Sequence, residues 1–329
     1  MCLRSLNMPS EKADNIHASV LPDETVEILY ARSGGIFVDA TLGLGGHSEA
    51  ILNASDENRV VAMDQDQDAI RLATHRLKGF SDRISVFHSN FSEIRSVLAK
   101  AGIEQVDGIF ADLGVSSLQL DSEERGFSFR FDGPLDMRMD PTSNDATAAE
   151  LLATLSEFDI ADVIYKYGEE RSSRRIARRI VEKREAGEPI KTTGELARLT
   201  ERSVRRSKKD KLHPATRTFQ ALRIAVNREM EVLEKFIVEA VSSLKIDGRL
   251  AIISFHSLED RIVKHSFQRM AGKCICPPRM PQCICGARTE VEILTRKPII
   301  PSEFEIAENI RSRSAKLRAV RKVAATQAS

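Results

Sequence analysis

The chain has 329 residues, in which 49 Lys and Arg nearly balance 48 Asp and Glu. The net charge of +1 excludes a uniformly basic nucleic-acid-binding protein, whereas 42% hydrophobic and 29% charged residues are typical of a globular protein with a substantial core. The sequence has no apolar run of membrane-spanning length, and residues 1–15 lack the apolar block of a secretory signal, so we expect a cytoplasmic protein that is not inserted in a membrane.

The first third of the sequence predicts alternating strands and helices. Apolar strands are expected at residues 36–40, 59–64, 83–88 and 106–111, with helices beginning at residue 47 and spanning residues 66–77 and 93–99. Alternation at this pitch predicts an α/β fold with a parallel, doubly wound sheet and right-handed crossovers.

The middle of the chain predicts helices only, from about residue 141 to residue 211. Thr147 and Thr192 each stand three residues before a glutamate, which is the pattern of a capping box. Gly168 and Gly187 are expected to end helices. After Thr216 we expect one long amphipathic helix, then a strand at residues 248–255 and a last strand at residues 291–295, followed by a polar, mobile tail.

These patterns divide the chain into three segments. Residues 1–140 form the first part of an α/β domain, residues 141–215 an inserted helical domain, and residues 216–329 the second part of the α/β domain. The insertion is basic, because residues 171–211 carry 15 Lys and Arg against 6 Asp and Glu. A second basic run without acids covers residues 311–322. Both runs favour a partner that carries phosphates, although solvated helix faces explain them equally well.

A glycine-rich turn, residues 39–47 (DATLGLGGH), joins the first strand to the first helix of the α/β pattern. Glycines at such a junction allow a tight turn and a close approach of the backbone to a ligand. A dinucleotide-binding turn requires a third Gly or Ala where this chain has Ser48. Because Asp39 leads the turn, the pattern fits the D-x-T-x-G-x-G turn of S-adenosylmethionine-dependent methyltransferases instead.

Three acids, Asp39, Asp64 and Asp112, end three of the predicted strands. Ligands bind beyond the carboxyl ends of the strands in open α/β sheets, so these acids predict one site. Asp64 is expected to accept hydrogen bonds from two ribose hydroxyls, and Asp66 to cap the next helix. Phe91 is a candidate to cover an adenine ring, with core packing as the alternative.

Seven sequence blocks, spread over nearly the whole chain, carry a resemblance to a known family. They are residues 17–21 (HASVL), 39–47 (DATLGLGGH), 112–117 (DLGVSS), 124–129 (ERGFSF), 132–140 (DGPLDMRMD), 213–220 (HPATRTFQ) and 254–261 (SFHSLEDR). With these blocks the chain closely resembles the 16S rRNA cytosine-N4 methyltransferase family.

The resemblance implies a Rossmann-like S-adenosylmethionine-dependent methyltransferase sheet with an inserted all-helical domain. It also implies methyl transfer to the exocyclic N4 of one cytidine in the decoding (P-site) region of 16S rRNA, within the small ribosomal subunit. The family's contacts to S-adenosyl-L-methionine fall here on Gly45, Gly46, His47, Asp64, Phe91, Asp112 and Gln119. A methyltransferase on another nucleic acid or a small amine, and a non-catalytic rRNA-binding assembly factor, are the alternatives.

The chemistry of an aromatic amine assigns the catalytic role to Asp112. The amine is a poor nucleophile, so the site must align it and accept its N–H hydrogen bonds, which a carboxylate can do. The turn after Asp112 lacks the aromatic residue that amino-methylating enzymes often carry there. Phe127, Phe129 and Phe131 are candidates to stack on the target base, with packing in the core as the alternative.

Four polar residues are candidates for substrate binding. His213, Arg217 and Gln220 lie where the helical insertion rejoins the α/β domain, and we expect them to face RNA, with helix capping as the alternative. His256 follows a predicted strand end, where it either contacts the target cytidine or is a structural histidine. The oligomeric state is left open between a monomer and a homodimer.

Four of the five cysteines cluster near the end of the chain. Cys274, Cys276, Cys283 and Cys285 form a C-x-C…C-x-C pattern, whose spacing is closer than zinc ligands usually have. We therefore expect reduced thiols and no metal, with a zinc site as the alternative.

Overall fold

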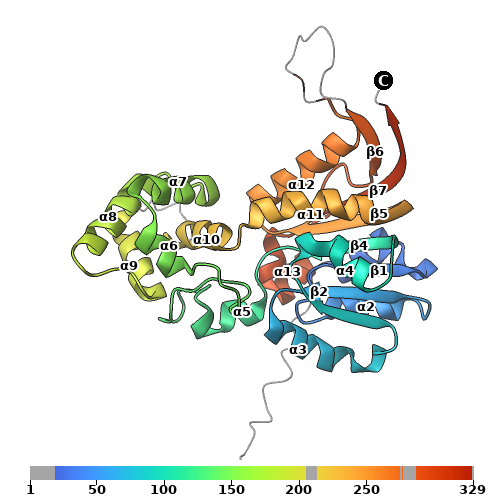
Figure 1. The fold of residues 1–329 in the computed structure, drawn as a ribbon, viewed down its shortest axis with the longest axis horizontal. Helices are drawn as coiled ribbons and strands as arrows, with labels where there is room; N and C mark the ends of the chain where they lie inside the picture. The colour runs from blue at the N-terminus through green and yellow to red at the C-terminus, as the bar shows by residue number, and fades with distance from the viewer. Residues whose placement is uncertain (1–18, 205–212, 275, 277–286, 328–329) are drawn as a thin grey trace, which may run out of the picture.

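The structure is a computed structural model that describes residues 19–204, 213–274, 276 and 287–327. Seven strands form one sheet in the order β3-β2-β1-β4-β5-β7-β6 (Figure 1). Their bounds are β1 (Ile36–Asp39), β2 (Arg59–Asp64), β3 (Ile84–His88), β4 (Val106–Asp112), β5 (Leu244–Ser254), β6 (Arg288–Ile293) and β7 (Lys316–Gln327). Strands β1 to β5 run parallel to one another, and β7 runs antiparallel to both of its neighbours.

Thirteen α-helices accompany the sheet within the described residues. They are α1 (Pro22–Ile28), α2 (Gly46–Ala54), α3 (Gln67–Arg76), α4 (Ile94–Lys100), α5 (Ser117–Asp121), α6 (Ala148–Thr154), α7 (Glu157–Gly168), α8 (Ser173–Glu185), α9 (Thr193–Ser203), α10 (Ala215–Val226), α11 (Glu229–Ser243), α12 (Ser257–Met270) and α13 (Glu303–Glu308). None of them is both long and apolar enough to cross a bilayer.

Each buried strand sends alternate side chains to opposite faces of the sheet. In β1, Phe37 packs on one face with α1, α2 and α3, whereas Val38 packs on the other with α4, α11 and α12. In β4, Phe110 and Ile109 divide in the same way. Figure 1 shows α2 and α3 on one side of the sheet and α11 and α12 on the other. The two-sided burial explains why these strands read as continuous apolar runs.

Helices α6 to α9 form a separate helical body beside the sheet, to which α10 leads (Figure 1). This helical body has its own hydrophobic cluster, in which Ile176, Ile180 and Leu196 are at most 1% exposed. Both predicted capping boxes form, at the start of α6 and of α9. The cluster also contains Phe127 and Val226, which lie outside the predicted insertion, so it extends further along the chain than residues 141–215.

The single long helix predicted after Thr216 is wrong. Helix α10 ends at Val226 and α11 begins at Glu229, because Arg228 has left-handed backbone dihedrals, with φ of 49°. The side chain of Asn227 fixes this break: its Nδ2 donates to the carbonyl of Met137 and its Oδ1 accepts from the N–H of Met139, both at 2.8 Å. The apolar periodicity continues across the break, so the pattern alone could not reveal it.

The C-terminal basic run, residues 311–322, is not a mobile tail: it begins in a 3-10 helix (Ile310–Ser314) and continues into β7, so residues 291–295 do not hold the last strand. Strand β7 inserts between β5 and β6, and Leu317, Ala319 and Val320 are fully buried there. Three of its basic residues, Lys316, Arg318 and Arg321, pair with acids: Arg318 Nε contacts Asp260 at 2.6 Å. The polar predicted tail at the start of the chain lies outside the described residues.

Candidate functional site

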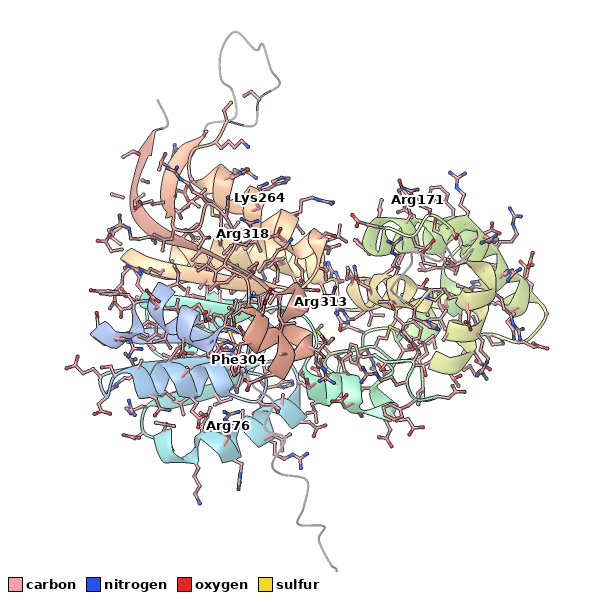
Figure 2. The ribbon with its side chains drawn as sticks, turned by 180° about the vertical axis from the view of Figure 1, so that it is seen from behind. Arg76, Arg171, Lys264, Phe304, Arg313 and Arg318 are labelled. Carbon is pink, nitrogen blue, oxygen red and sulfur yellow. The ribbon has the colours of Figure 1, made fainter. Side chains whose placement is uncertain are left out.

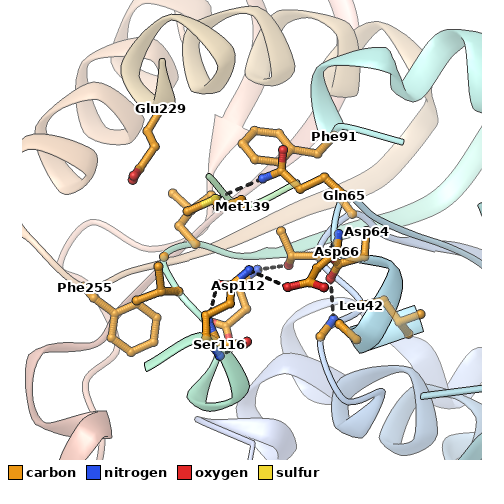
Figure 3. Close-up of a pocket in the computed structure, with 18 of the residues that line it drawn as sticks. Leu42, Asp64, Gln65, Asp66, Phe91, Asp112, Ser116, Met139, Glu229 and Phe255 are labelled. Atoms are coloured by element: carbon orange, nitrogen blue, oxygen red, sulfur yellow. Dashed lines mark hydrogen bonds between the residues drawn. The ribbon is translucent and has the colours of Figure 1, made fainter. Parts of the chain in front are cut away.

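A cavity of about 420 Å³ opens at the carboxyl ends of β1, β2 and β4. Figure 3 shows its two halves: Leu42, Asp64 and Phe91 lie on one side, Glu229 and Phe255 on the other. Asp112 lies between these sets. We call the first side, where predicted cofactor contacts lie, the cofactor half, and the second the substrate half, after the roles expected of them.

The glycine-rich turn is fixed to the end of the second strand. The N–H of Gly43 donates to Asp64 Oδ2 at 2.7 Å, and the N–H of Asp66 donates to Oδ1 of the same carboxylate at 2.9 Å. Gly45 has φ of 82°, a conformation that favours glycine. Because each carboxylate oxygen has a further lone pair, Asp64 retains acceptor capacity toward the cavity.

Six of the seven predicted cofactor contacts line this one cavity, and Gly45 does not. A Cβ on Gly46 would lie 1.9 Å from Ser19 Oγ, so the side chain of Ser19 packs against the backbone at a distance that only glycine permits. His47 is directed elsewhere, since its Nε2 lies 2.8 Å from the carbonyl oxygen of Val20. Burial lowers the pKa of His47 to about 4, so the ring is neutral at pH 7.

Gln119 belongs to a polar cluster under the cofactor half. Its Nε2 donates to Asp66 Oδ2 at 2.9 Å, and Arg125 Nη1 donates to the same oxygen at 2.8 Å. Asp66 also caps α3 by accepting from the N–H of Asp68, as predicted. The capping box of Ser116 and Gln119 at the start of α5 holds this arrangement in place.

Asp112 is the unsatisfied acid of the site. Its Oδ1 is buried and has no hydrogen-bond partner in the described part of the chain. Burial raises the pKa of Asp112 well above its usual value, and the nearby charges of Asp39 and Glu259 raise it further. A buried acceptor without a partner costs free energy of folding. A hydrogen-bond donor on a ligand would remove that cost.

Asp39 supports the site from below. Its carboxylate accepts from Ser48 Oγ at 2.7 Å and from the N–H of Thr41 at 3.2 Å. Burial raises the pKa of Asp39 to about 6 despite these bonds. The residue is completely buried and absent from the cavity wall, so it organises the turn without contacting a ligand.

Phe91 fits both of its predicted roles. Its ring packs edge-on against Phe236, with centroids 5.0 Å apart, and it also lines the cofactor half. Of the three candidate stacking residues, Phe127 is only 7% exposed and Phe129 packs against His213 and Phe219. Phe131 is 43% exposed and does not line the cavity.

The residues of the substrate half were missed by the sequence analysis. They come from three distant parts of the chain: Met139, Arg223, Asn227, Glu229, Phe255 and Glu259. Their only signal was membership of long matching blocks or of an amphipathic helix, which does not say which way a side chain points. In the helix, the unpredicted break after Val226 directs Glu229 toward the cavity (Figure 3).

Three charged side chains and a histidine form a cluster at the substrate half. Arg223 binds Glu229 through two hydrogen bonds of 2.8 and 2.9 Å, and His256 Nε2 lies 3.2 Å from Glu259 Oε1. Burial opposes the charge on Glu259, but His256 and Arg223 lower its pKa below the usual value. Oxygen and nitrogen atoms of Glu229, His256 and Glu259 approach within 4.8 Å. The positively charged guanidinium of Arg223 beside these three residues disfavours the binding of a metal cation.

The four predicted substrate residues do not line the main cavity. His213 stacks near Phe129 and accepts from the N–H of Ala215, whereas Gln220 donates to the carbonyl of Tyr167 at 3.0 Å. Arg217 is half exposed, 4.0 Å from the carboxylate of Glu170. His256 is the N-cap of α12 and lines a smaller cavity on the far side of Phe255. These contacts match the structural alternatives, and RNA contact stays a prediction.

The basic segments divide into structural and exposed arginines. Arg184 Nη1 donates to three backbone carbonyls at the end of α6, and Arg179 Nη1 donates to the carbonyl of Arg202. Arg171 and Arg174 are exposed on the helical body. Figure 2 shows Arg171 there and Arg313 beside the junction of the helical body with the sheet. Arg313 forms no ion pair within the described residues.

Half of the cysteine cluster can be described. The N–H of Cys276 lies 3.4 Å from the sulfur of Cys274. Cys283 and Cys285 lie outside the described residues, so a zinc site stays untested.

Comparison with known proteins gives consistent matches. The model of the MraW methylase family matches residues 14–323. A ribosomal RNA small subunit methyltransferase H of Carboxydothermus hydrogenoformans is 50% identical over 307 residues, 93% of this chain and 98% of the relative. One of Geobacter sp. strain M21 is 50% identical over 309 residues, with the same coverage. The solved structure of a putative rRNA methylase from Clostridium thermocellum aligns over 93% of this chain and 98% of that chain, with 10% identity and a TM-score of 0.42.

Proposed function

The chain belongs to the MraW methylase family of S-adenosylmethionine-dependent methyltransferases, and from that premise we propose that it methylates the exocyclic N4 of one cytidine in 16S rRNA. The curated relatives act, by their names, on ribosomal RNA of the small subunit. The observation that carries the proposal is the buried Oδ1 of Asp112 between the two halves of the cavity, which has no hydrogen-bond partner among the described residues.

The cofactor half has the donors, acceptors and apolar surfaces that S-adenosylmethionine requires. Asp64 would accept from the ribose hydroxyls, Phe91 would cover the adenine, and the glycine-rich turn would lie beside the amino-acid end. When bound, the cofactor supplies an electrophilic methyl group and leaves as a neutral thioether. The buried acids Asp64 and Asp112 complement its positive charge, which in turn favours their ionised forms.

Asp112 performs the proton chemistry at the target nitrogen. Its Oδ1 accepts a hydrogen bond from the N4 amine and so orients the nitrogen lone pair toward the cofactor half. As N4 gains its new bond to carbon, it acquires a positive charge and carries one proton in excess. The carboxylate stabilises that charge and then takes the proton, leaving a neutral methylated amine.

Electrostatics around Asp112 favour this sequence. Asp39 and Glu259 place further negative charge nearby, and both raise the pKa of Asp112. A carboxylate with a raised pKa is a better base than an ordinary surface carboxylate. The same acids disfavour a negatively charged nucleophile, so the site suits a neutral amine that becomes cationic.

The target lies, on this proposal, in the decoding region near the P site, and the enzyme works in the cytoplasm on rRNA of the small subunit. Arg171 and Arg174 on the helical body, with Arg313 on the sheet body, would contact the phosphate backbone. The target base would leave its stack to reach Asp112, as bases do in enzymes that modify them.

Mass-spectrometric mapping of rRNA nucleosides tests the proposal. Cells that lack the protein should lose the N4-methyl group at one cytidine of 16S rRNA, and the wild-type chain should restore it whereas Asp112→Asn should not. An unchanged set of methylated cytidines would overturn it. Titration calorimetry with S-adenosylmethionine separates a non-catalytic RNA-binding factor, which would show no binding.

A further inference from the structure

The junction of α10 and α11 forms a rigid wall of the substrate half. Asn227 ties it to the residue 137–139 segment, and its Nδ2 also donates to the carbonyl of Arg223 at 2.8 Å. The left-handed backbone of Arg228 places Glu229 at the start of α11, where it faces the cavity (Figure 3). Side chains on this wall are therefore fixed before any ligand binds.

Arg223 is held on that wall in one orientation. Its Nε donates to Glu229 Oε1 at 2.8 Å and its Nη2 donates to Oε2 at 2.9 Å. The side chain is 14% exposed and that of Glu229 is 10% exposed, and both line the cavity. The Nη1 group donates no hydrogen bond to any described residue. A guanidinium anchored along one edge thus retains N–H donors for a ligand.

The edge of cytosine requires donors beside its amine. The N4 amine donates, whereas the neighbouring N3 and O2 both accept, so a site that offers only Asp112 would leave two acceptors unpaired in a buried cavity. Uracil differs at N3, which carries a hydrogen and would oppose an N–H donor. A fixed guanidinium on this side therefore accepts cytosine and rejects uracil.

We propose that Arg223, oriented by Glu229, is the base-recognition residue of this enzyme and donates to N3 and O2 of the target cytosine while Asp112 accepts from N4. The inference rests on the proposed function and adds the specificity site to it. Two other arginines line the cavity, but Arg76 lies beside Gly46 in the cofactor half, and Arg311 is bound to Ser117 and Asp121.

A double substitution distinguishes a role of Arg223 in recognising the base from a role in stabilising the fold. Arg223→Met with Glu229→Met replaces the buried ion pair by apolar side chains of similar size, which folded proteins generally tolerate. The matched control is Arg228→Met with Glu231→Met, a neighbouring pair that is 72% and 64% exposed. We expect both variants to fold and to bind S-adenosylmethionine normally. Only the first should lose kcat/KM for small-subunit rRNA, by about 10- to 100-fold.

An altered substrate gives a second, non-structural readout. The affinity for RNA containing 3-deazacytidine at the target, in which C–H replaces N3, is measured in the presence of S-adenosylhomocysteine. Wild type should bind it about 10-fold more weakly than cytidine RNA, and the Arg223 variant should bind the two equally. Should the double variant not fold, Arg223→Lys serves, because it keeps the charge beside Glu229 but loses the planar fork.

Equal discrimination by wild type and variant would overturn the role of Arg223, as would full kcat/KM in the double variant. Failure of the proposed function is recognised separately. In that case the wild-type enzyme itself would transfer no methyl group to cytidine N4, whatever residue stands at position 223.

Discussion

The hydroxyl of Thr41 accepts a hydrogen bond from the backbone N–H of Asp112 at 2.6 Å. This bond joins the glycine-rich turn after β1 to the end of β4, which lie 71 residues apart in sequence. The turn that would hold the cofactor and the carboxylate that would hold the amine are therefore parts of one rigid unit. Such fixed geometry is what an in-line transfer between the two ligands needs.

Asp112→Asn should abolish most activity while leaving the fold at least as stable as wild type. The amide cannot take the proton, so we expect a loss of about 10²- to 10⁴-fold in kcat. Because burial already opposes the charged form, removing the ionisable group should not lower the melting temperature. Asp68→Asn, at an exposed acid of α3, is the control. A fully active Asp112→Asn enzyme would contradict the assigned role.

Asp64→Asn should weaken cofactor binding. The amide oxygen can still accept from Gly43, but the amide NH2 cannot accept from the N–H of Asp66, and hydrogen bonds from ribose hydroxyls to a charged acceptor are lost. At about 1.5–3 kcal/mol for such bonds, the Kd for S-adenosylmethionine should rise roughly 10- to 150-fold in titration calorimetry. An unchanged Kd would place the ribose elsewhere.

His47 and Asp39 should make opposite contributions to the pH dependence of folding. The pKa of His47 falls from 6.5 to about 4 on burial, so its contribution is complete above pH 6.5 and is lost as the pH falls toward 4. The pKa of Asp39 rises from 3.8 to about 6, so its contribution is complete below pH 3.8 and is lost as the pH rises through about 6.

Urea unfolding at a series of pH values tests this opposition. On acidification from pH 6.5 to 4, the free energy of unfolding of His47→Gln should rise by about 2.5 kcal/mol relative to wild type, and that of Asp39→Asn should fall by about 2 kcal/mol relative to it. If both variants follow the wild-type pH profile, neither group titrates as described.

Gly168→Ala should loosen the helical body. A Cβ there would lie 2.5 Å from the carbonyl oxygen of Arg217, so α7 and α10 would have to separate. We expect a loss of about 1–3 kcal/mol in the free energy of unfolding. Gly79→Ala is the matched control, since no heavy atom lies within 4 Å of its added Cβ. Equal stability of the two variants would show that α7 and α10 accommodate the added methyl group without loss of stability.

Charge reversal at Arg171, Arg174 and Arg178, which are exposed at the start of α8, should weaken binding to small-subunit RNA. Each lost phosphate contact should also reduce the slope of log K against log salt by about 0.9, as measured by filter binding at several salt concentrations. Arg184→Ala is the contrast, because that side chain holds three carbonyls of the protein and should mainly lower stability. Unchanged affinity would identify the three arginines as a solvated helix face.

The sequence by itself determined the α/β class, the four leading strands and the glycine-rich turn after the first of them. These depend on local periodicity, on capping patterns and on glycines at a strand-to-helix junction, which act over a few residues. Asp64 and Asp112 could be placed because the ends of parallel strands meet at one edge of the sheet. The long blocks of residue identity indicated the family.

Only the tertiary structure decided the substrate half and the last strand. Residues 311–322, which lead into β7, contain six basic residues and therefore resemble a polar tail. Pairing of β7 with β5 and β6 nevertheless buries its apolar face, and Asp260 neutralises Arg318. Likewise, Arg223 and Glu229 face the cavity because Asn227 bonds to a segment about 90 residues away and breaks the helix between them. Contacts between distant segments leave no periodic trace in the sequence, so they emerge only when the chain is folded.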